Sequence, residues 1–287
     1  MPSTYVQHLV VQNPGNGKRA LLFRSREQFD PGAFGEESQT DGDCTSHGDR
    51  SARDTARCVE IHIKKEPERY EGRGATEPTY GSRGHSGAGM DPGLAARFVT
   101  EYGFMIRKNY LGCIDLSQYN SSIGAQWGRS GPSPCVKSAC KEHPVGQYVM
   151  PDTPNEALAL FYNGFPCHSG QNIGFNVTPN SLGIYERGRR PWNHDMATVG
   201  YDDTKEIWPS RVYFVVNSWG AWNSQWEKWE RDPDLLKILG PPIVGMFTVD
   251  ADIWETYFLG GQSIYFYSDI TGFPMQKLPD YGTGSFL

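Results

Sequence analysis

Residues 215–220 read Val-Val-Asn-Ser-Trp-Gly, which sets a polar amide at the end of an apolar run. The run predicts a buried strand over 212–216, so Asn217 falls where that strand ends. An amide held there can accept a hydrogen bond from an imidazole N–H, and the ring of Trp219 can keep water away from that bond. The alternative interpretation is a strand that ends in an ordinary polar turn.

A second segment, residues 191–202, reads Pro-Trp-Asn-His-Asp-Met-Ala-Thr-Val-Gly-Tyr-Asp. Its apolar part predicts a strand over 196–201, and His194 stands at the entry to that strand. A histidine in this position can face a cleft while the strand holds it rigidly. The alternative is a hydrogen-bonded structural histidine, which is what a lone histidine usually is.

The third segment, residues 39–48, reads Gln-Thr-Asp-Gly-Asp-Cys-Thr-Ser-His-Gly and precedes a predicted helix over 45–66. Apolar residues at steps of four, three and four form one stripe of that helix: Ala52, Ala56, Val59 and Ile63. Cys44 stands at the helix start, where unpaired N–H groups stabilise a thiolate and can bind an oxyanion. Gln39 lies close enough to add a side-chain N–H donor. The alternative is a small buried cysteine.

The rest of the chain predicts an α+β protein in three parts. Residues 1–36 form an N-terminal arm with short strands over 5–11 and 20–23 and a turn over 13–17. Residues 37–150 form a helix-rich lobe that includes a helix over 92–102. Residues 151–287 form a strand-rich lobe. This last part begins with a helix over 153–163 and continues with strands over 173–177, 244–249 and 263–267.

Composition and charge exclude several classes of function. The 287 residues carry a net charge of −6, so the chain lacks the cationic surface that nucleic acid binding requires. We expect no membrane partner, since no segment is long and apolar enough to span a bilayer. The first residues show no signal-peptide pattern, which favours a cytoplasmic or virion location. We expect no metal and no other cofactor, because the histidines lack ligand spacing and no Cys-x-x-Cys pair occurs.

Taken together, the three segments resemble the papain family of cysteine peptidases. Residues 217–220 match its Asn motif letter for letter, the run from His194 resembles its His strand, and Gln39 with Cys44 resembles its oxyanion-hole Gln and nucleophile. His194 follows Cys44 by 150 residues, within the usual range of about 130–150.

The resemblance implies a papain-like fold of two lobes with the active-site cleft between them. A helical left lobe would carry Cys44, and a β-barrel-like right lobe would carry His194 and Asn217. The implied activity is that of a thiol peptidase acting on a peptide or protein substrate. Residues 80–83, Tyr-Gly-Ser-Arg, look like the family's substrate-pairing strand, so Gly81 and Ser82, with Trp219, are the implied substrate-binding residues. The Gly-rich stretch 80–89 can equally be a flexible linker.

Departures from the pattern keep other functions open. Asp41 and Thr45 stand where the family has a Cys and a Trp, and Asp43 beside Cys44 opposes thiolate formation. Residues 42–44, 163–166 and 272–274 look most like divergent papain-like proteins of bacteriophages and some bacteria. One alternative is therefore a structural or virion-associated protein, working in a homo-oligomer or virion assembly. A second alternative is a Cys-His amidase or cell-wall peptide hydrolase.

Overall fold

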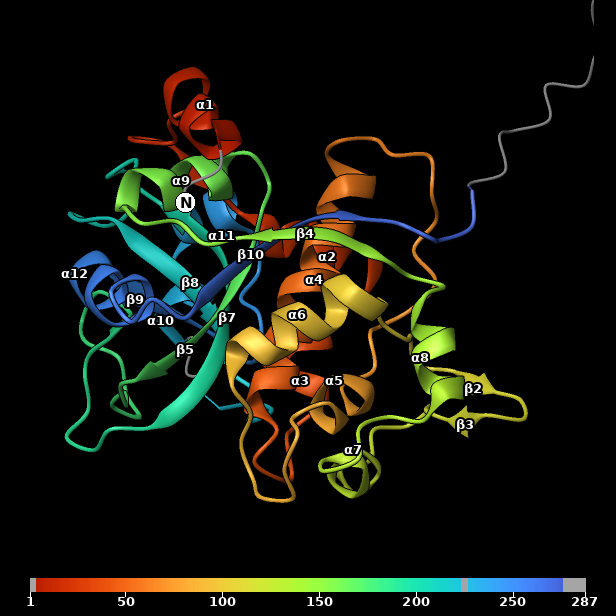
Figure 1. The fold of residues 1–287 in the computed structure, drawn as a ribbon. Helices are drawn as coiled ribbons and strands as arrows, with labels where there is room; N and C mark the ends of the chain where they lie inside the picture. Colours follow the sequence, from red (N-terminus) through yellow and green to blue (C-terminus); the bar gives the residue numbers. More distant parts are fainter. Residues whose placement is uncertain (1–3, 223–226, 276–287) are drawn as a thin grey trace, which may run out of the picture.

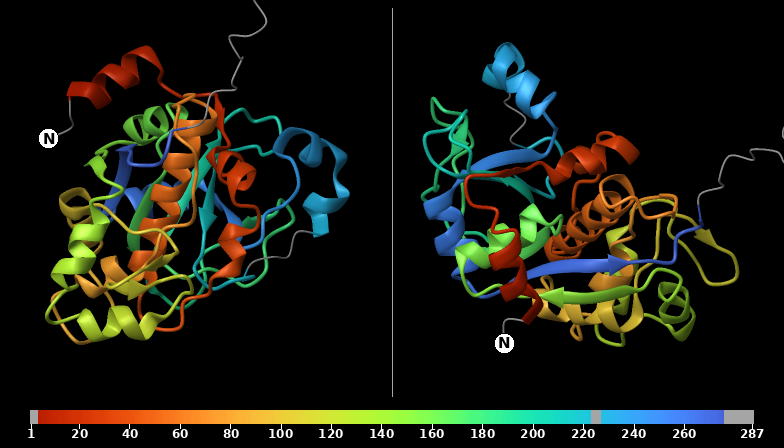
Figure 2. Two further views of the ribbon diagram at one scale, coloured as in Figure 1. Left: turned by 90° about the vertical axis from the view of Figure 1, so that its right-hand side faces the viewer. Right: turned by 90° about the horizontal axis from the view of Figure 1, so that it is seen from above.

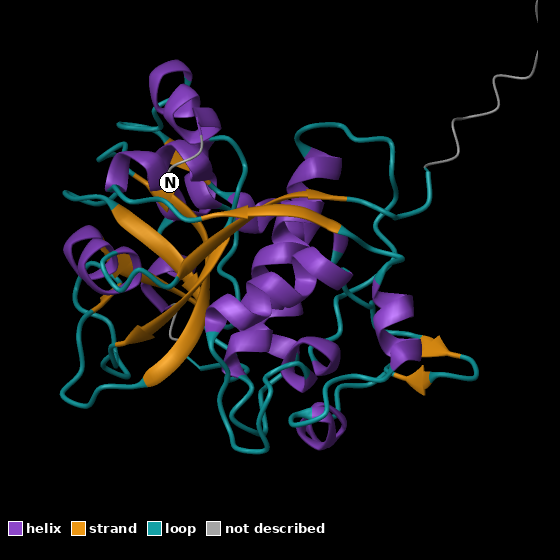
Figure 3. Ribbon diagram, in the orientation of Figure 1, coloured by secondary structure: helices purple, strands orange, loops and turns teal. Residues whose placement is uncertain are grey.

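The computed structural model describes residues 4–222 and 227–275. The main sheet lies on one side of the molecule with a few helices around it, and the other side is mostly helical (Figures 1 and 3), as expected for an α+β fold of two lobes. The helical lobe contains α4 (Cys44–His62), α5 (Glu77–Gly81), α6 (Pro92–Tyr102), α7 (Ser121–Trp127) and α8 (Pro134–Cys140), with the small hairpin of β2 (Asn109–Tyr110) and β3 (Ile114–Asp115).

The other lobe is built on one sheet with the strand order β4-β10-β5-β7-β8-β9-β6, and β1 pairs with β7 outside this path. Its strands are β1 (Arg19–Ala20), β4 (Val145–Val149), β5 (Cys167–Asn172), β6 (Ile184–Tyr185), β7 (Asn193–Asp202), β8 (Val212–Val216), β9 (Met246–Asp250) and β10 (Ile264–Ile270). All neighbours pair antiparallel except β6 and β9. In the ranges described, the end strands β4 and β6 do not pair, so the sheet is open and not a closed barrel.

Helix α4 lies at the centre of the molecule, against β7, β5 and β10 on one side and α2 (Leu22–Phe29) and α6 on the other. The predicted apolar stripe is buried as far as Val59, whereas Ile63 is exposed. The charged face is buried as well, and its residues form ion pairs such as Asp49–Arg53 at 2.8 Å and Arg57–Glu60 at 3.2 Å. The amphipathic pattern therefore understates how completely this helix is enclosed.

Several predicted elements are confirmed. Helix α6 spans the predicted residues, capped at its start by Asp91 and ended by Gly103 at φ 83°. The predicted helix over 153–163 is α9 (Pro154–Tyr162), which begins with a capping box made by Thr153 and Glu156. Strand β8 has its predicted bounds, and β9 and β10 begin within two residues of theirs.

Three strand predictions are wrong in whole or in large part. Residues 5–11 lie in helix α1 (Thr4–Gln12), because the apolar spacing there also fits a helix, and Val6 and Leu9 are buried where α1 packs on α9. Residues 20–23 contribute only Ala20 to a strand before α2 begins. Over 173–177 only Phe175 forms a bridge, whereas the central strand β5 precedes it. Its sequence Cys-His-Ser-Gly-Gln-Asn carries little β propensity.

The remaining elements complete the chain: α3 (Ala33–Glu36), α10 (Glu227–Arg231), α11 (Pro233–Leu239), α12 (Ala251–Trp254) and the π-helix η1 (Glu255–Leu259). Helices α10 and α11 project from the body in both views of Figure 2. Across residues 4–222 and 227–275, no helix has the length and apolar character needed to cross a membrane.

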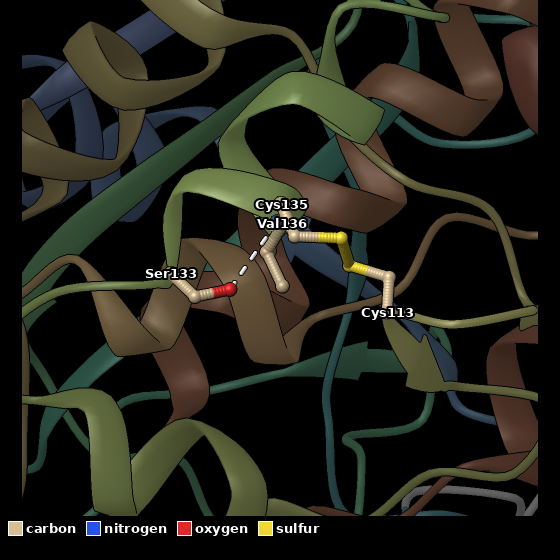
Figure 4. Close-up of a disulfide and its surroundings, with 4 residues drawn as sticks. All are labelled: Cys113, Ser133, Cys135 and Val136. Atoms are coloured by element: carbon tan, nitrogen blue, oxygen red, sulfur yellow. Dashed lines mark hydrogen bonds between the residues drawn. A yellow bond between two sulfur atoms is a disulfide. The ribbon is translucent and has the colours of Figure 1, made fainter.

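A disulfide that the sequence did not predict joins Cys113, in the turn between β2 and β3, to Cys135 at the start of α8 (Figure 4). Beside it, Ser133 caps α8 by accepting a hydrogen bond from the N–H of Val136. The other four cysteines are free and buried. Disulfides persist in oxidising surroundings, so the cellular location stays a prediction.

Candidate active site

Cys44 is the first residue of α4, and its side chain is 9% exposed at one wall of a cleft. Burial and then the charge of Asp195 raise the pKa of its thiol to about 11, although backbone hydrogen bonds from Asp195 and Thr45 partly offset this effect. The backbone N–H groups near the start of α4 therefore lower the pKa of this thiol by less than burial raises it.

His194 lies across the same cleft, on β7, and is held from behind by Asn217 at the end of β8. Its Nε2 is 2.8 Å from Oδ1 of Asn217, and both side chains are buried. The ring of Trp219 stacks on the imidazole with centroids 4.6 Å apart. Trp219 thus covers the imidazole that Asn217 holds, but it is not among the residues that line the cleft, and its substrate-binding role stays a prediction.

The hydrogen bonds around Asn217 define the tautomer of His194. Oδ1 of Asn217 also accepts a hydrogen bond from the Ser218 N–H at 2.7 Å, which identifies that atom as the amide oxygen. The His194 Nε2 must then be the donor. Burial lowers the pKa of His194 to about 4, so the ring is neutral and Nδ1 is its basic nitrogen.

The cleft has a volume of about 540 Å³ and brings together residues from both lobes. Its walls come from the start of α4, the loop before α6, strands β5 and β7, and the turn after η1. Its lining residues are Cys44, Thr45, Gly89, Met90, Pro92, Gly170, Gln171, Asn172, Asn193, His194, Asp195, Thr256, Tyr257, Gly260, Gly261 and Ser263. Three other cavities among the described residues are larger, but none of the three is lined by both a cysteine and a histidine.

In the described part of the chain, no hydrogen bond joins the Cys44 sulfur to His194. The sulfur instead interacts with the backbone of Asp195, the residue that follows His194. The structure thus places a neutral thiol and a neutral imidazole on one cleft, and it does not form an ion pair between them.

Gln39 lies beside the Asn217 motif and does not line this cavity. Its backbone N–H donates to the carbonyl of Ser218 at 2.7 Å, and its Oε1 accepts from the Ser218 hydroxyl. Its Nε2 donates to the carbonyl of Asp41 at 2.9 Å, which leaves one N–H of the amide for another acceptor. The oxyanion role of Gln39 stays a prediction.

The structure does not bring Gly81 and Ser82 to the cleft. Residues 77–81 form helix α5 and not the expected strand, and Gly81 packs so closely on Trp127 that a Cβ there would lie 2.8 Å from the indole. The far end of the same Gly-rich stretch reaches the cleft instead. There Gly89 donates its N–H to the Gly42 carbonyl at 2.9 Å, and Met90 lines the wall.

Asp43, the anion expected to oppose the thiolate, is engaged elsewhere. Its Oδ2 accepts a hydrogen bond from Tyr119 at 2.7 Å and lies 3.4 Å from Nε2 of His47. It raises the pKa of Cys44 less than burial and Asp195 do. Asp195 is therefore the more important carboxylate, and no local pattern in the sequence singled it out.

No protein-family model and no curated protein matches the sequence. Several solved structures, in contrast, are similar to this one. Xylellain, a cysteine protease from Xylella fastidiosa, has a TM-score of 0.56 at 15% identity, over 94% of this chain and 90% of its own. The cysteine protease and lectin-like domains of Cwp84 from Clostridium difficile have a TM-score of 0.48 at 16% identity, over 82% of this chain and 49% of their own. Digestive procathepsin L 3 of Tenebrio molitor has a TM-score of 0.42 at 14% identity, over 80% of this chain and 64% of its own.

Identities this low carry information on the fold alone. The chain therefore has the two-lobed α+β fold of papain-like cysteine proteases.

Proposed function

We propose that this protein is a thiol peptidase in which Cys44 is the nucleophile and His194 the general base and acid. The observation that carries the proposal is the pairing of His194 with Asn217. That bond keeps the proton on Nε2 and leaves a basic Nδ1 on the cleft that Cys44 also lines.

In the proposed reaction, Nδ1 of His194 takes the proton of the Cys44 thiol as the sulfur attacks the carbonyl carbon of a peptide bond. The resulting oxyanion accepts hydrogen bonds from backbone N–H groups at the start of α4, and a shift of the Gln39 side chain toward the cleft adds its remaining N–H. His194 then donates the proton to the leaving amine, and a thioester remains on Cys44. Water, deprotonated by His194, hydrolyses the thioester and restores the thiol.

The cleft also supports an expectation about the substrate. Among the described residues that line the cleft, Asp195 alone has a charged side chain, and that carboxylate is buried and paired with His168. Met90 and Pro92 add apolar surface, while glycines keep the space open. We expect an uncharged side chain of the substrate to occupy the cleft, because none of the lining residues that the structure describes offers an exposed charge to an ionic one.

The test is cleavage of a library of fluorogenic peptides by the wild-type chain and by Cys44→Ala. Cys140→Ala is the matched control, because Cys140 is also a buried free cysteine but lies in α8, outside the cleft. We expect cleavage by the wild type and by Cys140→Ala, and none by Cys44→Ala.

A folded wild-type chain that cleaves no peptide would contradict the proposal and favour a scaffold role. Hydrolysis of cell-wall peptides alone would favour the amidase alternative. Three further proposals remain: a virion location, an assembly of several copies, and kinship with phage and bacterial proteins. Mass determination of native particles tests the first two.

A further inference from the structure

A continuous chain of buried hydrogen bonds links the strand that carries His194 to the helix that carries Cys44. Asp195 accepts from Nδ1 of His168 on β5 at 3.0 and 3.1 Å. Nε2 of His168 lies 3.0 Å from the hydroxyl of Tyr267 on β10, and that hydroxyl donates to Oδ1 of Asp49 on α4 at 2.7 Å. We call Asp195, His168, Tyr267 and Asp49 the buried relay.

The direction of these bonds determines the charge of His168. The phenol of Tyr267 has one proton, which it donates to Asp49, so its oxygen must accept from His168 Nε2–H. The Asp195 carboxylate accepts from Nδ1–H. His168 thus donates at both ring nitrogens and is an imidazolium. Burial is the largest single effect and lowers the pKa of His168, but the charge and hydrogen bond of Asp195 together with the charge of Asp49 outweigh it, so the pKa is raised.

The relay is dry and its charges are balanced. All four of its side chains are at most 1% exposed. Asp195 and His168 form one ion pair, and Asp49 forms the other with Arg53 at 2.8 Å. The rings of Tyr265 and Tyr267 lie parallel to the imidazolium, with centroids 5.3 and 5.6 Å away. Such a network is costly to bury unless every member has its partners, so it specifies one arrangement of the groups it joins.

That arrangement includes the proposed nucleophile and base. Asp195 is bonded to His194 through the chain, and its backbone hydrogen-bonds to the Cys44 sulfur. One turn into α4, a Cβ on Gly48 would lie 2.1 Å from Asp195 Oδ1, so the helix backbone rests directly on this carboxylate. The relay and this contact together determine how far α4 stands from β7.

We propose that the buried relay positions Cys44 against His194 by tying α4 to β7 across the interface between the lobes. The proposal rests on the proposed function, since it concerns the same pair of residues. Its members are positioning residues and touch no substrate. A displacement of about 1 Å at a reacting pair can cost about 100-fold in rate, so the loss of one relay bond should reduce turnover measurably.

The test compares Tyr267→Phe with Tyr201→Phe. Each variant removes one hydroxyl from a fully buried tyrosine in the same sheet, but the Tyr201 hydroxyl donates to the Gly15 carbonyl at 2.7 Å and has no path to Cys44. We expect Tyr267→Phe to lower kcat about tenfold or more with KM within about twofold, and Tyr201→Phe to keep kcat within about twofold. Equal kcat losses in both variants would overturn the proposal.

A second readout needs no substrate. Without the Tyr267 oxygen, His168 loses an acceptor for its charge, so Asp195 is less compensated and the Cys44 thiol becomes harder to ionise. Alkylation of Cys44 by iodoacetamide, followed by peptide mass mapping, should slow at least threefold in Tyr267→Phe and stay unchanged in Tyr201→Phe. His168→Gln, which keeps a donor but loses the charge, should slow it as well.

The kinetic and the alkylation measurements distinguish failure of the proposed function from failure of the buried relay. If the wild type cleaves no peptide, the proposed function fails, yet the alkylation rates still decide on the relay. Thermal unfolding of each variant establishes that the folded protein is compared. If Tyr267→Phe does not fold, the alkylation rate of His168→Gln decides, and a rate equal to the wild type overturns the proposal.

Discussion

Gly48→Ala tests the close approach of α4 to β7. The added methyl carbon would lie 2.1 Å from Oδ1 of Asp195, whereas ordinary contact begins near 3.4 Å, so the helix and strand must separate by about 1.3 Å. Asp195 cannot simply turn away, because both its oxygens accept from His168. Alanine in a helix interior normally gains about 0.5–1 kcal/mol over glycine, whereas overpacking costs about 1–3 kcal/mol. A loss of stability in Gly48→Ala would therefore indicate the close contact, and a gain would indicate that there is room for the methyl group.

We expect Gly48→Ala to lose about 1–2 kcal/mol of unfolding free energy, a few degrees in Tm, and about 100-fold in kcat for peptide cleavage. The measurements are thermal unfolding by circular dichroism and steady-state kinetics. Gly72→Ala is the control, since a Cβ there meets only Ile106, at 3.9 Å. A Gly48→Ala protein as stable and as active as the wild type would refute the close contact and the spacing argument built on it.

Three further predictions follow from the same structure. Asn217→Ala frees the His194 ring to adopt other tautomers, so kcat should fall at least about tenfold while Tm changes little, by steady-state kinetics and thermal unfolding. Because burial raises the Cys44 pKa to about 11 and lowers that of His194 to about 4, iodoacetamide alkylation of Cys44 in the free protein should still accelerate above pH 9. A plateau already reached at pH 7 would mean that an ion pair exists. Burial also raises the pKa of Glu60 to about 7 from 4.5, so the fold favours its protonated form and stability is lost as pH rises between those values. Glu60→Gln should flatten the dependence of Tm on pH over that window, and an unchanged dependence would contradict the assignment.

Local signals in the sequence account for the elements that were predicted well. Helices α6 and α9 carry their own caps, Asp91 and Thr153, and strand β8 is a continuous apolar run. Such features depend on neighbours a few residues away. The Asn217 motif is another local signal, because the end of the strand and the aromatic residue beside Asn217 lie within one stretch of six residues.

Features that depend on distant partners were missed. Strand β5 has a polar sequence and is a strand because β7 and β10 pair with it on both sides. Gly89 and Met90, and not Gly81 and Ser82, reach the cleft, since the register of a Gly-rich loop carries no periodic signal. The relay joins Asp49 to Tyr267 across 218 residues, and no spacing rule connects them.

The most direct test of the account is labelling of the folded protein with a thiol-directed epoxide, read by intact mass and peptide mapping. We predict one adduct, on Cys44, with none on the buried cysteines Cys58, Cys140 and Cys167, and a labelling rate that falls sharply in His194→Ala. A folded protein whose Cys44 stays unmodified, or is labelled equally fast without His194, would contradict it.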